Sequence, residues 1–155
     1  MHRTALVWDD GLADYRFTAE HPLNPRRLEL TLGLIRACGL LDDDMRRLVP
    51  ARHASEDELL LAHAPEFVDA VKRASSGEAS LPLLQAFGLG SQDVPVVAGM
   101  HASAAHVAGA TLRAAELVMS GEVTRAWSIA GGLHHARRAE ASGFCVYNDL
   151  AIAIR

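Results

Sequence analysis

The sequence is 155 residues long, half of its residues are hydrophobic, and its formal net charge is −4. A chain of this size and composition can bury a core without disulfides or metals. Its acidic balance excludes the broad cationic surface that attracts nucleic acid or anionic lipid, so we expect no direct nucleic-acid partner and no membrane partner. Only two cysteines occur, Cys38 and Cys145, and they form no CxxC pair. This usage indicates a reducing, cytoplasmic environment and excludes a Cys-rich zinc module.

The first third of the sequence predicts a strand followed by a helix. Residues Thr4 to Trp8 form a short β-favouring apolar run that ends at an Asp-Asp-Gly turn, as a buried strand does when it opens into a loop. An Asn-Pro pair then precedes a run of apolar residues spaced along one helical face, and a glycine follows it. We therefore expect an amphipathic helix with Leu28, Leu32 and Ile35 on its buried face and Gly39 at its end.

The middle of the sequence predicts further helices. Asp42, Asp43 and Asp44 follow the first helix, and such a run is far more often a solvated turn than a metal site. Ser55 and Glu58 form a capping-box pattern, and a second short helix is expected from Pro65 to the Ser-Ser-Gly sequence at residues 75–77.

The second half of the sequence predicts a loop, a long helix and another strand. Residues 81–95 carry glycines and prolines with little periodicity and predict a loop. Residues 97–120 predict a helix with one apolar stripe, namely Ala105, Ala108, Leu112, Ala115 and Met119. Residues 125–130 predict a strand, and Asn148 or Asp149 can cap a final helix that the sequence leaves unfinished. A strand, several helices and a second strand favour a parallel α/β sheet, with ligands at the carboxyl ends of its strands.

Two adjacent histidines, His134 and His135, follow a glycine pair directly after the second predicted strand. A histidine by itself can be a structural residue as easily as a catalyst. The context favours a site, because the glycine pair permits a tight turn and Gly143-Phe144 brings a second flexible point and an aromatic ring into the same segment. We therefore expect a pocket at this end of the sheet.

These residues resemble a known family. The segment GGLHHARRAEASGFCVYND, residues 131–149, resembles the active-site segment of class I and II histone deacetylases, and most closely that of their bacterial acetoin-utilization relatives. Upstream, DYRFTAEHPLNPRRLEL resembles the first loop and helix of that family, and GLGSQDVPV resembles its substrate-rim loop. The resemblance implies a parallel-sheet, arginase/deacetylase-like three-layer α/β fold, with residues 1–155 as the incomplete N-terminal part of a single deacetylase domain.

The resemblance also implies a chemistry. In that family a zinc-bound water attacks the acetyl carbonyl of an acetyl-lysine at the bottom of a narrow tunnel. His134 and His135 match the pair that handles the proton of the water and the leaving amine, and which of them is the base stays open. Gly143 and Phe144 match the tunnel wall, although Phe144 alone would suit an ordinary core. Proton transfer by such a group is worth roughly a hundred- to ten-thousand-fold in rate.

The resemblance assigns roles to two further residues, one in binding the substrate and one in binding the product. Asp93 matches a rim aspartate that accepts hydrogen bonds from the substrate backbone, but the preceding Ser91-Gln92 departs from the tyrosine common in histone-type enzymes, which leaves the preference for a peptide open. Arg27 matches a channel arginine that attracts acetate, with a solvated helix residue as its alternative. Tyr15 is expected to pack and His21 to shape the loop, while Cys145 is expected to be a neighbour of the pocket and no nucleophile.

The other histidines do not suggest a metal site. His101 and His106 are five residues apart on a predicted helix, whereas two ligands on one face need a spacing of three or four. The resemblance places the zinc ligands of the family, two aspartates and a histidine, beyond the last predicted helix. We therefore expect zinc as the cofactor of the intact enzyme, no complete metal site in this chain, and little activity of this chain alone.

Two alternatives stay open beside a deacetylase acting on an acetylated protein or a small acetyl-amide. One is a non-catalytic remnant or assembly module that keeps the first half of the fold. The other is an acetylpolyamine amidohydrolase, which would differ in the rim loop around Asp93 and not in the histidine pair. Because an incomplete sheet exposes an edge and apolar helix faces, we also expect self-association.

Overall fold

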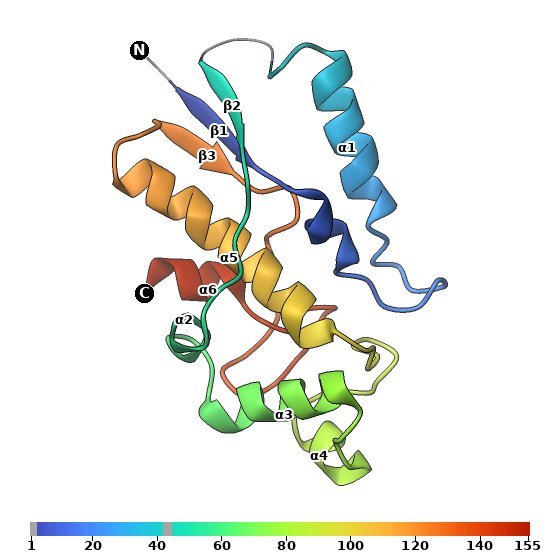
Figure 1. Ribbon diagram of the computed structural model, residues 1–155. Coiled ribbons are helices and arrows are strands. Elements are labelled where there is room, and N and C mark those ends of the chain that lie inside the picture. The colour runs from blue at the N-terminus through green and yellow to red at the C-terminus, as the bar shows by residue number, and fades with distance from the viewer. Residues whose placement is uncertain (1–2, 42–44) are drawn as a thin grey trace.

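The computed structural model describes residues 3–41 and 45–155, and it confirms a parallel α/β fold (Figure 1). Three strands, β1 (Thr4–Val7), β2 (Arg46–Val49) and β3 (Arg125–Trp127), form a sheet in the order β2-β1-β3. Both neighbours run parallel to β1, which is the central and almost fully buried strand. The predicted acidic turn at residues 42–44 lies outside the described residues.

Helices surround this small sheet. Figure 1 shows α1 and α5 on either side of the strands, α6 beside α5, and α3 with α4 near the start of α5. A 3-10 helix, Asp10–Asp14, follows β1. The α-helices are α1 (Arg26–Ala37), α2 (Glu56–Leu60), α3 (Pro65–Ser76), α4 (Leu81–Ala86), α5 (Met100–Met119) and α6 (Asp149–Ile154). Within the described residues, no helix combines the length and apolar character needed to cross a bilayer.

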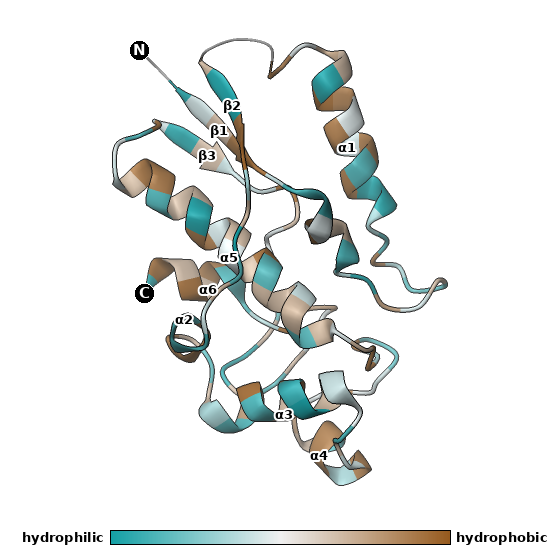
Figure 2. Ribbon diagram, in the orientation of Figure 1, coloured by the Kyte–Doolittle hydropathy of each residue, from teal (hydrophilic) through white to brown (hydrophobic). Residues whose placement is uncertain are grey.

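The helices with strong local signals form as predicted. In α1 the residues Leu28, Leu32 and Ile35 are buried, and Figure 2 shows hydrophobic and hydrophilic residues alternating along this helix. The capping box of α2 is complete, since the Ser55 hydroxyl accepts from the Glu58 amide and the Glu58 carboxylate accepts from the Ser55 amide. Local sequence alone is enough to specify both features.

The structure differs from the prediction in three elements. Residues 81–86 are helical where a loop was predicted, because Ser80 occupies the N-cap and a proline fits the first turn of α4. The second predicted strand is shorter and ends at Trp127. Strand β2 was not predicted at all, since Val49 is its only buried residue and its sequence has no apolar run.

The long helix α5 is buried more widely than its predicted apolar stripe. Met119, placed on that stripe, is 85% exposed, whereas His106 and Gly109 are buried. The reason is that α5 packs against β1, β3, α3, α6 and the segment before α2. At Gly109 a Cβ atom would lie 1.9 Å from the Arg52 carbonyl oxygen, so only glycine permits this approach.

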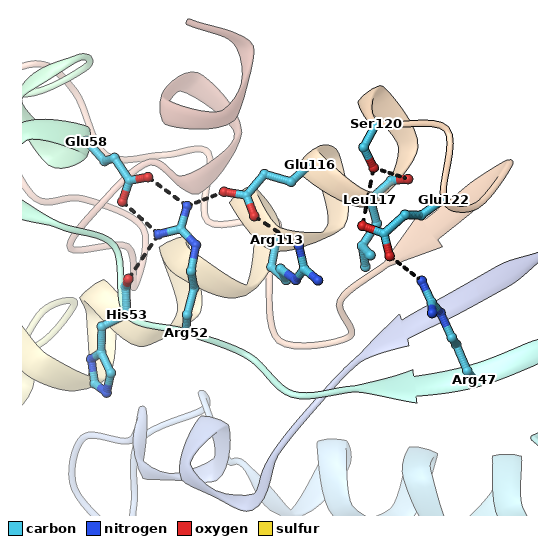
Figure 3. A network of polar contacts seen from close by, with 9 residues as sticks. All are labelled: Arg47, Arg52, His53, Glu58, Arg113, Glu116, Leu117, Ser120 and Glu122. Carbon is cyan, nitrogen blue, oxygen red and sulfur yellow. Dashed lines mark hydrogen bonds and ion pairs between the residues drawn. The ribbon is translucent and has the colours of Figure 1, made fainter.

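An ion-pair network reinforces the same contact (Figure 3). The guanidinium of Arg52 donates to the carboxylates of Glu58 and Glu116 and to the carbonyl oxygen of His53. The hydrogen bond from Arg52 lowers the pKa of Glu58 to about 2. The network therefore ties α2 and the segment before it to the outer surface of α5.

Candidate active site

The loop between β3 and α6 carries the predicted histidine pair. Its tight start uses Gly132, which has a φ of 94°, and the His134 amide donates to the Gly132 carbonyl oxygen at 3.0 Å. His134 and His135 follow in a turn, both exposed, with ring centroids 4.4 Å apart and ring planes 48° apart. Two imidazoles thus lie side by side in the loop that leaves the carboxyl end of a parallel strand, and ligand sites of such sheets gather in these loops.

One of the predicted wall residues, Gly143, is in direct contact with this pair. Gly143 has a φ of 55°, and a Cβ atom there would lie 2.6 Å from Cβ and Cγ of His135. Phe144 follows with a φ of 67°, a left-handed conformation that costs a non-glycine residue about 1–2 kcal/mol. Two successive residues therefore turn the chain in the left-handed region, and the half-buried Phe144 directly follows the glycine that lies against His135.

Tyr15 holds this turn from the other end of the sequence. Its hydroxyl donates to the Phe144 carbonyl oxygen at 2.7 Å and accepts from the Val146 amide at 3.1 Å. Burial raises the pKa of Tyr15 well above its usual range, so the hydroxyl stays protonated and can donate. The sequence predicted only a packing role for Tyr15. No local pattern reveals the hydrogen bonds, since the partners lie 129 and 131 residues away.

Asp93 also contacts the wall. Its carboxylate accepts from the Gly143 amide at 2.5 Å, and the residue is otherwise exposed at the rim. The buried His21 donates through Nε2 to the Asp93 carbonyl oxygen at 3.3 Å, and its ring packs edge-on against Phe144 at 4.6 Å. Asp93, His21 and Phe144 therefore form one connected rim from three distant segments.

Arg27 lies apart from the other predicted site residues. It is an exposed residue at the start of α1, and it lines a narrow cavity of about 10 Å³ behind the histidine loop. Tyr15 and Leu133, the residue before His134, line the same cavity. A volume of this size holds about one water molecule. The cavity connects the predicted channel arginine to the back of the loop.

The remaining chemistry-bearing side chains near the site have structural partners. The Cys145 thiol is buried and donates to the Gly143 carbonyl oxygen at 3.2 Å, and burial raises its pKa, which disfavours the reactive thiolate. His101 shares a hydrogen bond of 2.8 Å with the Tyr147 hydroxyl, and His106 contacts the Asp9 carboxylate at 3.2 Å. Across residues 3–41 and 45–155, no group of three or more His, Cys, Asp or Glu side chains could hold a metal ion. The described residues therefore do not fit a complete zinc site.

The fold and the loop geometry can be compared with known proteins. The chain matches the Histone deacetylase domain family over residues 21–155. It belongs to this family. It is 42% identical over 155 residues to the acetoin utilization protein AcuC of Bacillus subtilis (strain 168), covering 100% of this chain and 40% of that protein. The same protein of Staphylococcus aureus (strain MSSA476) is 41% identical over 150 residues, which are 97% of this chain and 38% of that protein.

Solved structures agree with this assignment. A crystal structure of an HDAC homolog from Aquifex aeolicus superimposes with a TM-score of 0.84 at 28% identity, over 98% of this chain and 40% of that chain. An HDAC homolog complexed with SAHA gives a TM-score of 0.81 at 28% identity, over 99% of this chain and 40% of that chain. The chain thus spans about two fifths of the length of the relatives it matches, and the resemblance to an N-terminal portion of the deacetylase fold is confirmed.

Proposed function

We propose that this chain carries the proton-transfer and substrate-contacting part of a deacetylase site that hydrolyses acetyl-lysine or a related acyl-amide. The observation that carries the proposal is the pair His134–His135, exposed in the loop between β3 and α6 with ring centroids 4.4 Å apart. Amide hydrolysis needs a group that takes a proton from the attacking water and a group that protonates the leaving amine. Two adjacent imidazoles can supply both.

The neighbouring residues suit a lysine side chain in the same proposal. Gly143 lets the backbone lie against His135, and the Phe144 ring offers an apolar surface for the methylenes of the substrate. Asp93 at the rim has an exposed carboxylate that can accept hydrogen bonds from a peptide backbone. Arg27, on the cavity behind the loop, is assigned to attracting the acetate product.

Zinc belongs to this proposal as the cofactor of the complete enzyme. Residues 3–41 and 45–155 contain no metal-binding group. The zinc ligands would therefore have to come from other residues of the complete enzyme. We therefore propose that the 155-residue chain alone has little or no turnover. The two free cysteines suit a cytoplasmic location for the enzyme.

A chimera tests the proposal. Residues 1–155 would replace the matching residues of B. subtilis AcuC, and hydrolysis of an acetyl-lysine peptide would be measured with added zinc. We expect turnover by the chimera and none by the isolated chain. His134→Ala and His135→Ala should each lower kcat by about 100-fold or more, whereas the control His53→Ala, at an exposed histidine far along the chain, should not. A folded chimera whose rate does not depend on either histidine would refute the assignment.

The same assay separates the alternatives. Hydrolysis of an acetylated polyamine in preference to the peptide would favour the acetylpolyamine amidohydrolase. A folded chimera inactive on both substrates would favour a non-catalytic remnant. Appreciable turnover by the isolated chain would refute the proposal that it is inactive alone.

A further inference from the structure

The histidine rings are not fixed by hydrogen bonds of their own. Within the described residues, neither the His134 nor the His135 imidazole has a hydrogen-bond partner, and both rings are exposed. Their position is therefore determined by the loop backbone and by the contact of Gly143 with His135. Any group that fixes this backbone also fixes the geometry of the pair.

Asp149, the first residue of α6, fixes the backbone before the pair. Its carboxylate is fully buried and accepts from the Gly132 amide at 2.9 Å, the Leu133 amide at 2.6 Å and the Thr111 hydroxyl at 2.5 Å. All three partners donate, so both oxygens of the side chain act as acceptors. A Cβ atom on Gly131 would lie 2.6 Å from this carboxylate, so glycine is needed where the loop passes over it.

Asn148 fixes the backbone within and after the pair. Its side-chain Nδ2 donates to the His134 carbonyl oxygen at 3.1 Å and to the Ala136 carbonyl oxygen at 2.9 Å. Its Oδ1 accepts from the Ala151 amide at 2.9 Å and so caps α6. Because both amide hydrogens and the oxygen are engaged, a flipped amide would place its oxygen against two carbonyl oxygens. The orientation of this side chain is therefore fixed.

Asn148 is itself held by a buried histidine. Its backbone amide donates to Nε2 of His63 at 2.9 Å, and His63 is only 1% exposed. The ring of His63 packs against Phe67 and Tyr147. The start of α6 is thus fixed to the core, and the hydrogen bonds from Asn148 to the loop fix the backbone of the exposed pair relative to it.

We propose that Asn148 and Asp149 are positioning residues for the His134–His135 pair, which they hold on both sides through backbone hydrogen bonds. This inference rests on the proposed function in taking the pair as the reacting groups. The catalytic reason is geometric, because a displacement of about 1 Å in a reacting group can cost roughly a hundredfold in rate. Neither residue touches the substrate, and both act through the loop.

Asn148→Asp tests the proposal with little change of shape. The new side chain keeps an oxygen that can cap α6 but loses both donors to the His134 and Ala136 carbonyl oxygens. The matched control is Ala151→Gly, which weakens the same helix and leaves Asn148 in place. Both variants would be compared in the intact 155-residue chain by NMR of the histidine rings.

In Asn148→Asp we expect the ring signals of His134 and His135 to shift and the contact between the two rings to be lost, while the His53 and His106 signals stay unchanged. In Ala151→Gly all four sets of signals should stay in place despite a lower melting temperature. The proposal is overturned if Asn148→Asp leaves the pair unchanged, or if Ala151→Gly moves it equally.

Asp149→Asn gives an independent result. Hydrogen exchange of the Gly132 and Leu133 amides should speed up at least tenfold, because one of their acceptors becomes a donor; unchanged exchange would refute the role of Asp149. In the AcuC chimera, Asn148→Asp should lower kcat by about a hundredfold and leave KM within about twofold. The NMR and exchange results need no turnover, so a chimera that proves inactive would count against the proposed function and not against this inference.

Discussion

The hydrogen bonds of Tyr15 permit a quantitative test by the single substitution Tyr15→Phe. The substitution removes only the hydroxyl, which lies between the Phe144 carbonyl oxygen at 2.7 Å and the Val146 amide at 3.1 Å. Val146 is fully buried and Tyr15 is 6% exposed, so the substitution leaves the Val146 amide unpaired in the core and removes the donor to the carbonyl oxygen of the half-buried Phe144.

Each buried group left without a partner costs about 1–3 kcal/mol. Allowing for partial relaxation of the turn, we expect Tyr15→Phe to lower the free energy of unfolding by about 2–4 kcal/mol. For a chain of this length this corresponds to a fall in melting temperature of roughly 4–16 °C. Thermal unfolding followed by circular dichroism, with urea unfolding as a second measurement, would give the value.

Tyr147→Phe is the matched control. The Tyr147 hydroxyl is also buried, but it shares a single hydrogen bond with His101, which is only half-buried and can be rehydrated. We expect this control to cost about 1 kcal/mol. If Tyr15→Phe were no more destabilising than Tyr147→Phe, the argument that the tyrosine hydroxyl maintains the wall would be wrong.

Three further predictions concern packing, protonation and association. Gly109→Ala should destabilise the fold by about 2–3 kcal/mol, because its Cβ would lie 1.9 Å from the Arg52 carbonyl oxygen. The control Gly33→Ala has open space around it and should stabilise the fold by about 1 kcal/mol. Equal effects in urea unfolding would contradict this prediction. Burial lowers the pKa of His63 below its usual 6.5, so below that pH the unfolded chain binds a proton that the folded chain excludes. The free energy of unfolding, measured with urea, should therefore fall as the pH is lowered from about 7.5 to about 5.5. His63→Gln should flatten this dependence on pH, and an unchanged dependence would rule out His63 as its origin. Trp127, which is 52% exposed, and Met119 border an apolar groove of about 570 Å³ beside the outer edge of β3. We therefore expect size-exclusion chromatography to show dimers or larger species, and Trp127→Glu to shift them toward monomer. A clean monomer at high concentration would contradict self-association.

The parts of the fold that local sequence specifies were predictable. The buried face of α1 and the capping box of α2 depend on residues three or four positions apart, and both appear as expected. Strand β2 escaped prediction because its burial depends on β1 and not on its own sequence, and only Val49 faces the core. Helix α4 was hidden by the glycines that follow it.

The site was predictable as a segment and not as a set of contacts. The resemblance singled out the histidine pair, the Gly143-Phe144 wall and Asp93, and the structure brings all of them together around one loop. Asn148 was predicted only as a helix cap, and that role is confirmed. Its two hydrogen bonds to the loop depend on how the loop returns to α6, which no periodicity in the sequence encodes.

The wall that Tyr15 completes also has a consequence for biosynthesis. Its partners follow it by 129 and 131 residues, so at about 5–20 residues per second they are synthesised roughly 6–26 s after Tyr15 itself. During that interval the helices can form from local contacts, but Tyr15, Phe17 and the buried ring of His21 have no wall to cover them. The wall therefore cannot form before Phe144 and Val146 have been synthesised, and the segment around Tyr15 needs protection until then.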